Sequence, residues 1–140
     1  MSTMLRTKKS KFPALLHLTY ILQQSSDEVL LHEAGVSLSQ TRIMSGLDSV
    51  MACSQRQLAS GLRQTEANIS RQLQVMKRQG LVSVTKNKKD ARQRDVKLTR
   101  KGASMYQKAE KILIRLQKTW YKQLDQSEDA AFDELSKSLV

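Results

Sequence analysis

The stretch that most constrains the fold is residues 54–99, in the middle of the 140-residue chain. Its pattern predicts two short helices followed by two alternating strands. Ser54 and Thr65 stand where their hydroxyls can cap a helix over 55–62 and a second helix over 66–79. Two helices joined by a short turn are typical of a helix-turn-helix, although an ordinary helical corner has the same pattern.

The second of these helices has an unusual outer face. Ile69, Leu73 and Met76 recur at spacings of four and three, so they share one face and should point to the core. The opposite face has no carboxylate and is rich in Asn, Gln and Arg, which fit adenine and guanine edges in the major groove. A solvated face would normally mix Glu with Lys, so DNA binding is favoured. The predicted DNA-binding residues here are Gln64, Thr65, Ala67, Asn68, Arg71 and Gln72.

The two strands, 81–85 and 95–99, enclose the basic segment KNKKDARQR. From Lys86 to Lys101 there are eight basic and two acidic residues. A hairpin tip this basic would repel itself unless phosphates or a narrow minor groove met it. Charge runs are usually solvated loops, but this one directly follows the candidate recognition helix. The residues predicted to hold phosphates are Gln55, Arg56, Lys86, Lys88, Lys89 and Arg94.

The rest of the chain predicts more helix. One helix is expected over 13–32, a second from Ser37 or Ser39 to about Met51, and a brief strand at 52–53 that could pair with the hairpin. Thr99 should cap a long helix that ends near Gln126, and Ser127 should cap the last one.

The terminal helices carry more apolar surface than the central unit can cover. The simplest solution is a two-fold dimer, and the alternative is a self-contained helical core. The predicted organisation is a helical dimerisation region over 1–36 and 100–140, and a DNA-binding domain over 37–99. The residues predicted at the dimer interface are Leu113, Leu116, Trp120, Leu124, Phe132 and Leu135.

The charge of the chain agrees with a polyanionic partner. Its 24 Lys and Arg against 13 Asp and Glu give a formal net charge of +11, which favours nucleic acid or an acidic membrane surface over a merely soluble basic protein. No apolar run approaches the roughly 20 residues of a membrane span, and the start of the chain lacks a signal-peptide core. Membrane attachment is therefore not expected.

Enzymatic and metal chemistry find no support in the sequence. The two histidines, His17 and His32, have no metal-binding spacing, and no glycine-rich phosphate loop occurs. We expect no enzyme activity, no cofactor and no metal. The single cysteine, Cys53, excludes an internal disulfide and suggests a reducing, cytoplasmic setting. Its place before a helix N-terminus could lower its pKa, but a small buried residue is the more frequent case.

Two segments carry a resemblance to a known family. QLASGLRQTEANISRQLQVMKRQGLV and KKDARQRDVKLTRKG resemble the helix pair and the wing of the MarR family of winged-helix transcriptional regulators. The residues of the wing pattern are Asp90, Arg92, Leu98, Thr99 and Gly102, and the match covers about residues 38–103. The implied fold is mainly α, with a small β-hairpin wing and an all-helical dimerisation region built from both chain ends.

The resemblance also implies a function. It implies a homodimer in which Arg92 enters the minor groove while Asp90 helps to hold the wing, and repression that a small ligand or an oxidant relieves. Ala91 departs from the family, where an arginine is frequent, and Lys88 with Lys89 can partly replace that contact. The usual effector pocket does not map onto residues 25–37. The alternative function is a winged helix used as a protein-interaction adaptor or as a nonspecific architectural DNA-binding protein.

Overall fold

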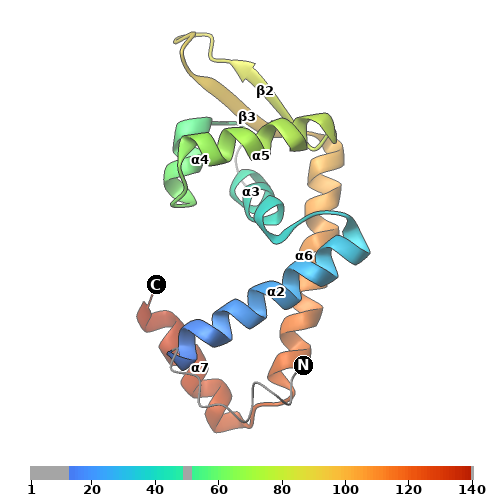
Figure 1. Ribbon diagram of the computed structural model, residues 1–140, viewed down its shortest axis with the longest axis vertical. Coiled ribbons are helices and arrows are strands. Elements are labelled where there is room, and N and C mark those ends of the chain that lie inside the picture. The colour runs from blue at the N-terminus through green and yellow to red at the C-terminus, as the bar shows by residue number, and fades with distance from the viewer. Residues whose placement is uncertain (1–12, 49–51, 140) are drawn as a thin grey trace.

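The computed structural model describes residues 13–48 and 52–139, and these form a mainly helical protein with one small sheet (Figure 1). This confirms the predicted class. The helices are α2 (Ala14–Ala34), α3 (Leu38–Asp48), α4 (Gln55–Gly61), α5 (Glu66–Arg78), α6 (Arg100–Tyr121) and α7 (Gln126–Leu139). The strands are β1 (Cys53–Ser54), β2 (Val82–Lys86) and β3 (Arg94–Leu98).

The three strands form an antiparallel sheet in the order β1-β3-β2. In the hairpin, Val84 pairs with Val96, and β1 adds a short edge through the pair Cys53 and Val96. The predicted brief strand at 52–53 is therefore confirmed, one residue later along the chain.

The core lies where α3, α5 and α6 meet the sheet and the end of α2. The three side chains of α5 that the spacing predicts to point inward are buried: Ile69 and Met76 are 0% exposed, and Leu73 is 2% exposed. The other large buried side chains come from five further segments and are Leu30, Val36, Ile43, Met44, Leu47, Leu81 and Val96. The helix-turn-helix thus shares one core with the start of α6.

Several helix ends follow the predicted signals. Gly35 after α2 and Gly80 after α5 have positive φ angles of 70° and 75°, where glycine lacks the steric cost of a side chain. Ser37 caps α3: its hydroxyl accepts from the Gln40 backbone N–H, and the Gln40 side chain accepts from the Ser37 N–H, both at 3.0 Å. The predicted end of this helix near Met51 lies outside the described residues.

The last two helix boundaries were predicted wrongly. Helix α6 ends at Tyr121 rather than near Gln126, and the cap of α7 is Asp125 rather than Ser127. The Asp125 carboxylate accepts from the Glu128 N–H and from the Ser127 hydroxyl, both at 2.8 Å. Both hydrogen bonds lower the pKa of Asp125, and the bond from the Glu128 backbone has the larger effect. Asp125 caps the helix in place of Ser127 because a charged carboxylate accepts stronger hydrogen bonds and is also stabilised by the positive end of the helix dipole.

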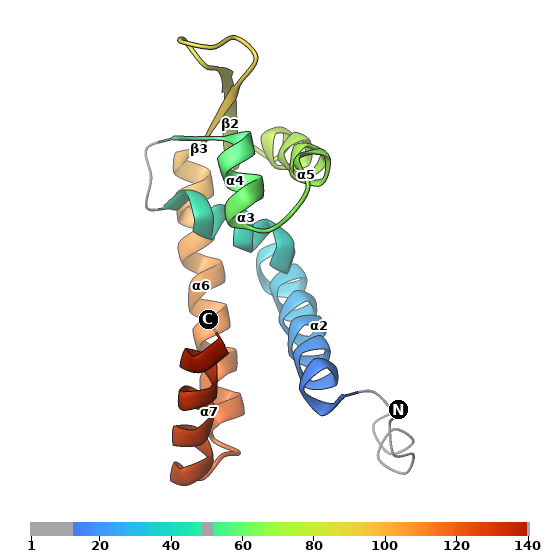
Figure 2. The ribbon, with the colours of Figure 1, turned by 90° about the vertical axis from the view of Figure 1, so that its left-hand side faces the viewer.

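Helix α6 is the long axis of the molecule. Figures 1 and 2 show it running from the sheet to the opposite end, where the chain turns back into α7 at an angle to α6 and α2 crosses α6. The wing and α5 lie at the end that is farthest from the loop between α6 and α7.

No helix within residues 13–48 and 52–139 combines the length and the apolar character that a membrane crossing requires.

Candidate nucleic-acid interface

The helix pair is fixed by capping and by its turn. Ser54 and Gln57 form a reciprocal capping box at α4, with both hydrogen bonds at 3.0 Å. Thr65 caps α5 by accepting from the Asn68 N–H at 3.1 Å, so both predicted caps are confirmed. The left-handed residue of the turn is Arg63, with φ 54°. Gly61 lies inside α4, so the positive φ of the turn falls on a residue other than glycine.

The outer face of α5 is arranged largely as its periodicity predicts. Ala67 and Arg71 are exposed, and Arg78 continues the same face at the end of the helix. Val75, an apolar residue on this face, is 41% exposed and is not among the predicted DNA-binding residues. Glu66 is the only carboxylate of α5, and it lies 3.6 Å from the guanidinium of Arg56. The exposed residues of α5 are therefore neutral or basic from Ala67 onward.

Three of the predicted DNA-binding side chains contact one another. The Gln64 carbonyl oxygen accepts from the Asn68 amide at 2.8 Å and from the Gln72 amide at 3.0 Å. All three residues are half-buried. The sequence pattern does not reveal these contacts, because they depend on Gln64 folding back from the turn onto the first two turns of α5.

The wing is held by a residue that sequence reasoning missed. The side-chain oxygen of Asn87 accepts from the backbone N–H groups of Lys89 at 2.8 Å and Asp90 at 3.0 Å. Its amide donates to both carboxylate oxygens of Asp95, at 3.2 and 3.0 Å. Asn within KNKKD is a turn signal, but the sequence does not show that its amide reaches Asp95 across the hairpin.

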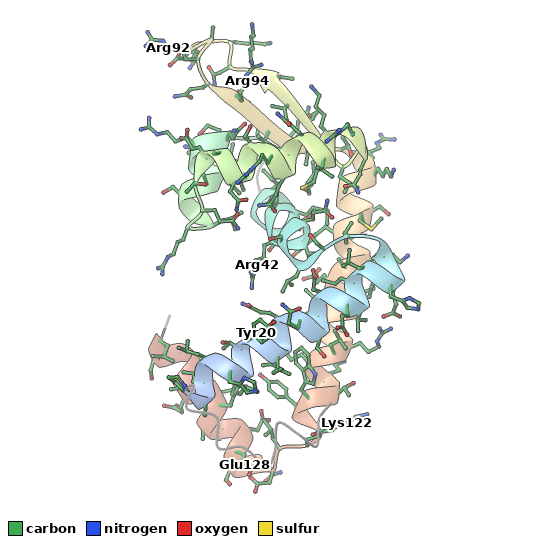
Figure 3. The ribbon with its side chains drawn as sticks, in the orientation of Figure 1. Tyr20, Arg42, Arg92, Arg94, Lys122 and Glu128 are labelled. Atoms are coloured by element: carbon green, nitrogen blue, oxygen red, sulfur yellow. The ribbon has the colours of Figure 1, made fainter. Side chains whose placement is uncertain are left out.

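Asp90 and Arg92 lie together at the tip. The Asp90 carboxylate accepts from the Arg92 N–H at 3.0 Å, and the Arg92 guanidinium, whose side chain is 96% exposed, is 4.0 Å from the same oxygen. Figure 3 shows Arg92 extending from the tip and Arg94 following on β3. A turn ordered by Asn87 and Asp90 thus presents an exposed arginine.

We expect Asn87→Ala to loosen the tip of the wing. The variant removes the acceptor of two backbone N–H groups, at a local cost of about 1 kcal/mol. Amide hydrogen exchange at Lys89 and Asp90 should become about fivefold faster. Lys88→Ala, which removes an exposed neighbouring side chain, is the control. Unchanged exchange in Asn87→Ala would show that the backbone alone orders the turn.

A groove separates the wing from the helix pair. It encloses about 480 Å³ and is lined by Ser54, Gln55, Arg56 and Glu66 on one side and by Asp90, Arg92, Gln93 and Arg94 on the other. A second groove of about 390 Å³ lies between α5 and the sheet, where Gln55 and Arg94 meet Gln74 and Lys77. Lys86, Lys88 and Lys89 are exposed on the wing. Of the predicted phosphate-holding residues, the structure therefore brings Gln55, Arg56 and Arg94 to the lining of two adjoining grooves, and the three lysines line neither groove. Arg56 already has Glu66 as a partner.

The predicted dimerisation residues do not all have the same environment. Leu113 and Leu116 are half-buried against the core, and Trp120 and Phe132 are half-buried at the far end. Leu124 and Leu135 are 37% and 44% exposed. An apolar cavity of about 490 Å³ opens between α2, α6 and α7, and its lining is Leu18, Leu22, Leu113, Gln117, Trp120, Tyr121, Gln123, Leu124 and Phe132.

Cys53 has a raised pKa, so its thiol is not activated. Burial is the first cause, and the negative charge of Asp95 is the second. The possibility of a lowered pKa is thereby contradicted, because β1 places the thiol against the sheet rather than at the end of the helix. Across residues 13–48 and 52–139, no three His, Cys, Asp or Glu side chains gather as a metal site would require.

We expect Cys53 to react slowly with iodoacetamide in the folded protein. The thiolate is the nucleophile, so the rate should rise with pH and reach half its maximum at a higher pH than for free cysteine. The same protein unfolded in urea is the control and should react like the free amino acid. A folded protein that reacts faster than free cysteine at pH 7 would contradict the raised pKa.

The family model described as "MarR family" matches residues 34–93 of this chain. The matched segment spans α3, the helix pair and most of the wing. Residues 34–93 are a MarR-family segment. The family predicted from the helix pair and the wing pattern is therefore confirmed. A comparison with curated proteins found no match.

Solved structures extend the likeness to the whole MarR-family fold. The DNA complex of MepR from S. aureus is 20% identical, with a TM-score of 0.78, over 92% of this chain and 98% of that one. A mutant of MarR from E. coli complexed with operator DNA is 22% identical, with a TM-score of 0.75, over 90% and 93%. A MarR/EmrR family transcriptional regulator from Acinetobacter sp. ADP1 is 23% identical, with a TM-score of 0.72, over 89% and 88%.

At these identities the likeness shows the fold, and it includes α2, α6 and α7 beyond the matched segment. The winged helix-turn-helix predicted from the sequence is thus confirmed as the architecture of this chain.

Proposed function

We propose that this chain is a sequence-specific, double-stranded DNA-binding transcriptional regulator. The observation that carries the proposal is the outer face of α5, which is neutral or basic from Ala67 onward and lies beside a wing with an exposed Arg92. Base edges in the major groove need Asn, Gln and Arg side chains, and phosphates need cations around them. MepR and the MarR mutant, which share this fold, are each found in a complex with DNA.

The contacts divide between two parts of the site. Ala67, Arg71 and the amide side chains of α5 would contact base edges, while Arg92 would enter the minor groove. The phosphates would be held by Gln55, Arg56 and Arg94 from the groove linings and by the exposed Lys86, Lys88 and Lys89 on the wing. Arg56 would contribute least, because its charge is already partly balanced by Glu66.

We also propose that the protein acts as a homodimer through the helical region at the chain ends. Helix α2 exposes five large apolar side chains, Leu15, Leu16, Leu18, Tyr20 and Ile21, each more than 40% exposed. Exposed apolar side chains gathered on one helix favour an interaction site, and a two-fold axis would cover both copies at once. Leu124 and Leu135, exposed near the apolar cavity, would join this interface.

The dimer would place two copies of α5 in successive major grooves of a pseudo-palindromic operator. By the family resemblance, we propose that binding blocks transcription, which makes the protein a repressor. A reporter gene placed behind the bound sequence should then be expressed more strongly in cells that lack the protein.

The DNA-binding proposal is tested by competition at a fixed salt concentration. A preferred duplex, selected from a random pool, should bind at least about a thousandfold more tightly than random duplex of equal length. Weak, salt-labile binding without a preferred sequence would instead identify an architectural binder or an adaptor.

A further inference from the structure

Gln64, Asn68 and Gln72 form one hydrogen-bonded amide network, which we call the amide triad. Asn68 and Gln72 are one turn apart on the same side of α5, and Gln64 comes from the turn before Thr65. The Gln64 carbonyl oxygen accepts from Asn68 at 2.8 Å and from Gln72 at 3.0 Å. Both lone-pair positions of that oxygen are therefore occupied.

The amide triad is anchored and sheltered. The Gln64 backbone N–H donates to the Ala59 carbonyl at 2.9 Å, and Arg63 before it has the left-handed φ of the turn. All three side chains of the triad are half-buried. The Gln72 carbonyl oxygen is buried and accepts no hydrogen bond from the described residues. Turning any one amide over would break a bond in the network, so the three orientations are coupled.

We infer that Gln64 is a positioning residue that sets the base preference of α5 through Asn68 and Gln72. The inference rests on the proposed DNA-binding function. Asn68 keeps its carbonyl oxygen and one N–H, which together match the N7 and N6 groups of adenine in the major groove. Because Gln64 already holds the Asn68 amide, the donating and accepting ends are fixed before DNA arrives. A side chain ordered in advance loses less entropy on binding.

Two substitutions separate positioning from direct base contact. Gln64→Met is similar in length but accepts neither amide, so the ratio of affinities for the preferred and random duplexes should fall about tenfold. Gln64→Glu keeps an oxygen for both amides. Its charge should weaken binding to every duplex, while selection from a random pool should return the same preferred sequence as for the wild type.

The coupling itself is measured by combining variants. Each variant lowers the ratio of affinities for the preferred and random duplexes by some factor. For the double variant Gln64→Met with Asn68→Ala, this factor should be at least about threefold smaller than the product of the factors for the two single variants, because both substitutions break the same network. The matched control is Gln64→Met with Gln74→Met. Gln74 is exposed on α5 and shares no hydrogen bond with Gln64 among the described contacts. The fall in the affinity ratio for this double variant should therefore equal the product of the falls for its two single variants. Circular dichroism of each variant checks that it folds.

Three results would overturn the inference. The first is a Gln64 and Asn68 double variant whose fall in the affinity ratio equals the product of the single falls, and the second is an unchanged affinity ratio in Gln64→Met. The third is a preferred sequence that changes in the same way in Gln64→Glu and Gln64→Met. The third result would mean that Gln64 contacts a base itself. A wild-type protein that binds all duplexes equally is a different failure. It would contradict the proposed function, and the inference with it.

Discussion

Replacing Gly102 with alanine is expected to destabilise the protein by about 3 kcal/mol or more. A Cβ atom at this position would lie 2.0 Å from the backbone carbonyl oxygen of Leu81. Neither side can yield easily, because the first turn of α6 is tied to the end of α5. Thr99 caps α6 and donates its hydroxyl to the Gly80 carbonyl, and the Lys101 ammonium donates to the Gln79 carbonyl at 2.8 Å.

Thermal unfolding followed by circular dichroism measures this effect. A loss of this size corresponds to a fall in Tm of roughly 10 °C for a chain of this length. The matched control is Gly61→Ala, because Gly61 is also helical but a Cβ there meets nothing within 4 Å. That variant should be unchanged or up to about 1 kcal/mol more stable. Equal Tm values for Gly102→Ala and the wild type would mean that α6 can shift away from the sheet without cost.

Arg71→Ala is expected to relax the base preference of the protein, at about 1–3 kcal/mol for the preferred site. Arg71 is exposed on the outer face of α5, one turn after Ala67, where a guanidinium can bond to both acceptors of guanine. Affinity for the preferred duplex should fall roughly 5- to 150-fold, with a much smaller fall for random duplex. Gel shifts at one salt concentration measure both affinities.

Two other arginines serve as comparisons. Arg92→Ala removes an exposed cation from the wing, so binding to preferred and random duplexes should weaken by similar factors. Arg42 extends from α3 toward α2, away from the wing (Figure 3), and Arg42→Ala should leave the ratio of the two affinities unchanged. If Arg71→Ala also leaves that ratio unchanged, Arg71 does not contact a base.

Local patterns were sufficient to predict most of the fold. The spacing of Ile69, Leu73 and Met76 identified the inner face of α5, and the hydroxyls of Ser54 and Thr65 marked both helix starts. These signals work because they act between residues one turn apart. At α7 two neighbouring residues could each provide the cap, and the sequence alone did not show that Asp125 would prevail over Ser127.

The sequence predicts candidate site residues but not the contacts between them. Composition identified the outer face of α5 and the basic wing, because the chemistry of DNA constrains which side chains can meet it. The bonds within the amide triad depend on how the turn at Arg63 directs Gln64, and that turn has no glycine at its left-handed position. The role of Asn87 depends on Asp95, eight residues away and across the hairpin.

We propose that the helical region of a dimer holds two copies of α5 at a fixed separation. The most direct test is binding to the preferred operator with its half-sites moved apart by roughly five base pairs, about half a turn of DNA. The two half-sites then lie on opposite faces of the duplex, and we expect the affinity to fall to that of a single half-site. An unchanged affinity would contradict the claim, because it would show that each copy binds its half-site independently.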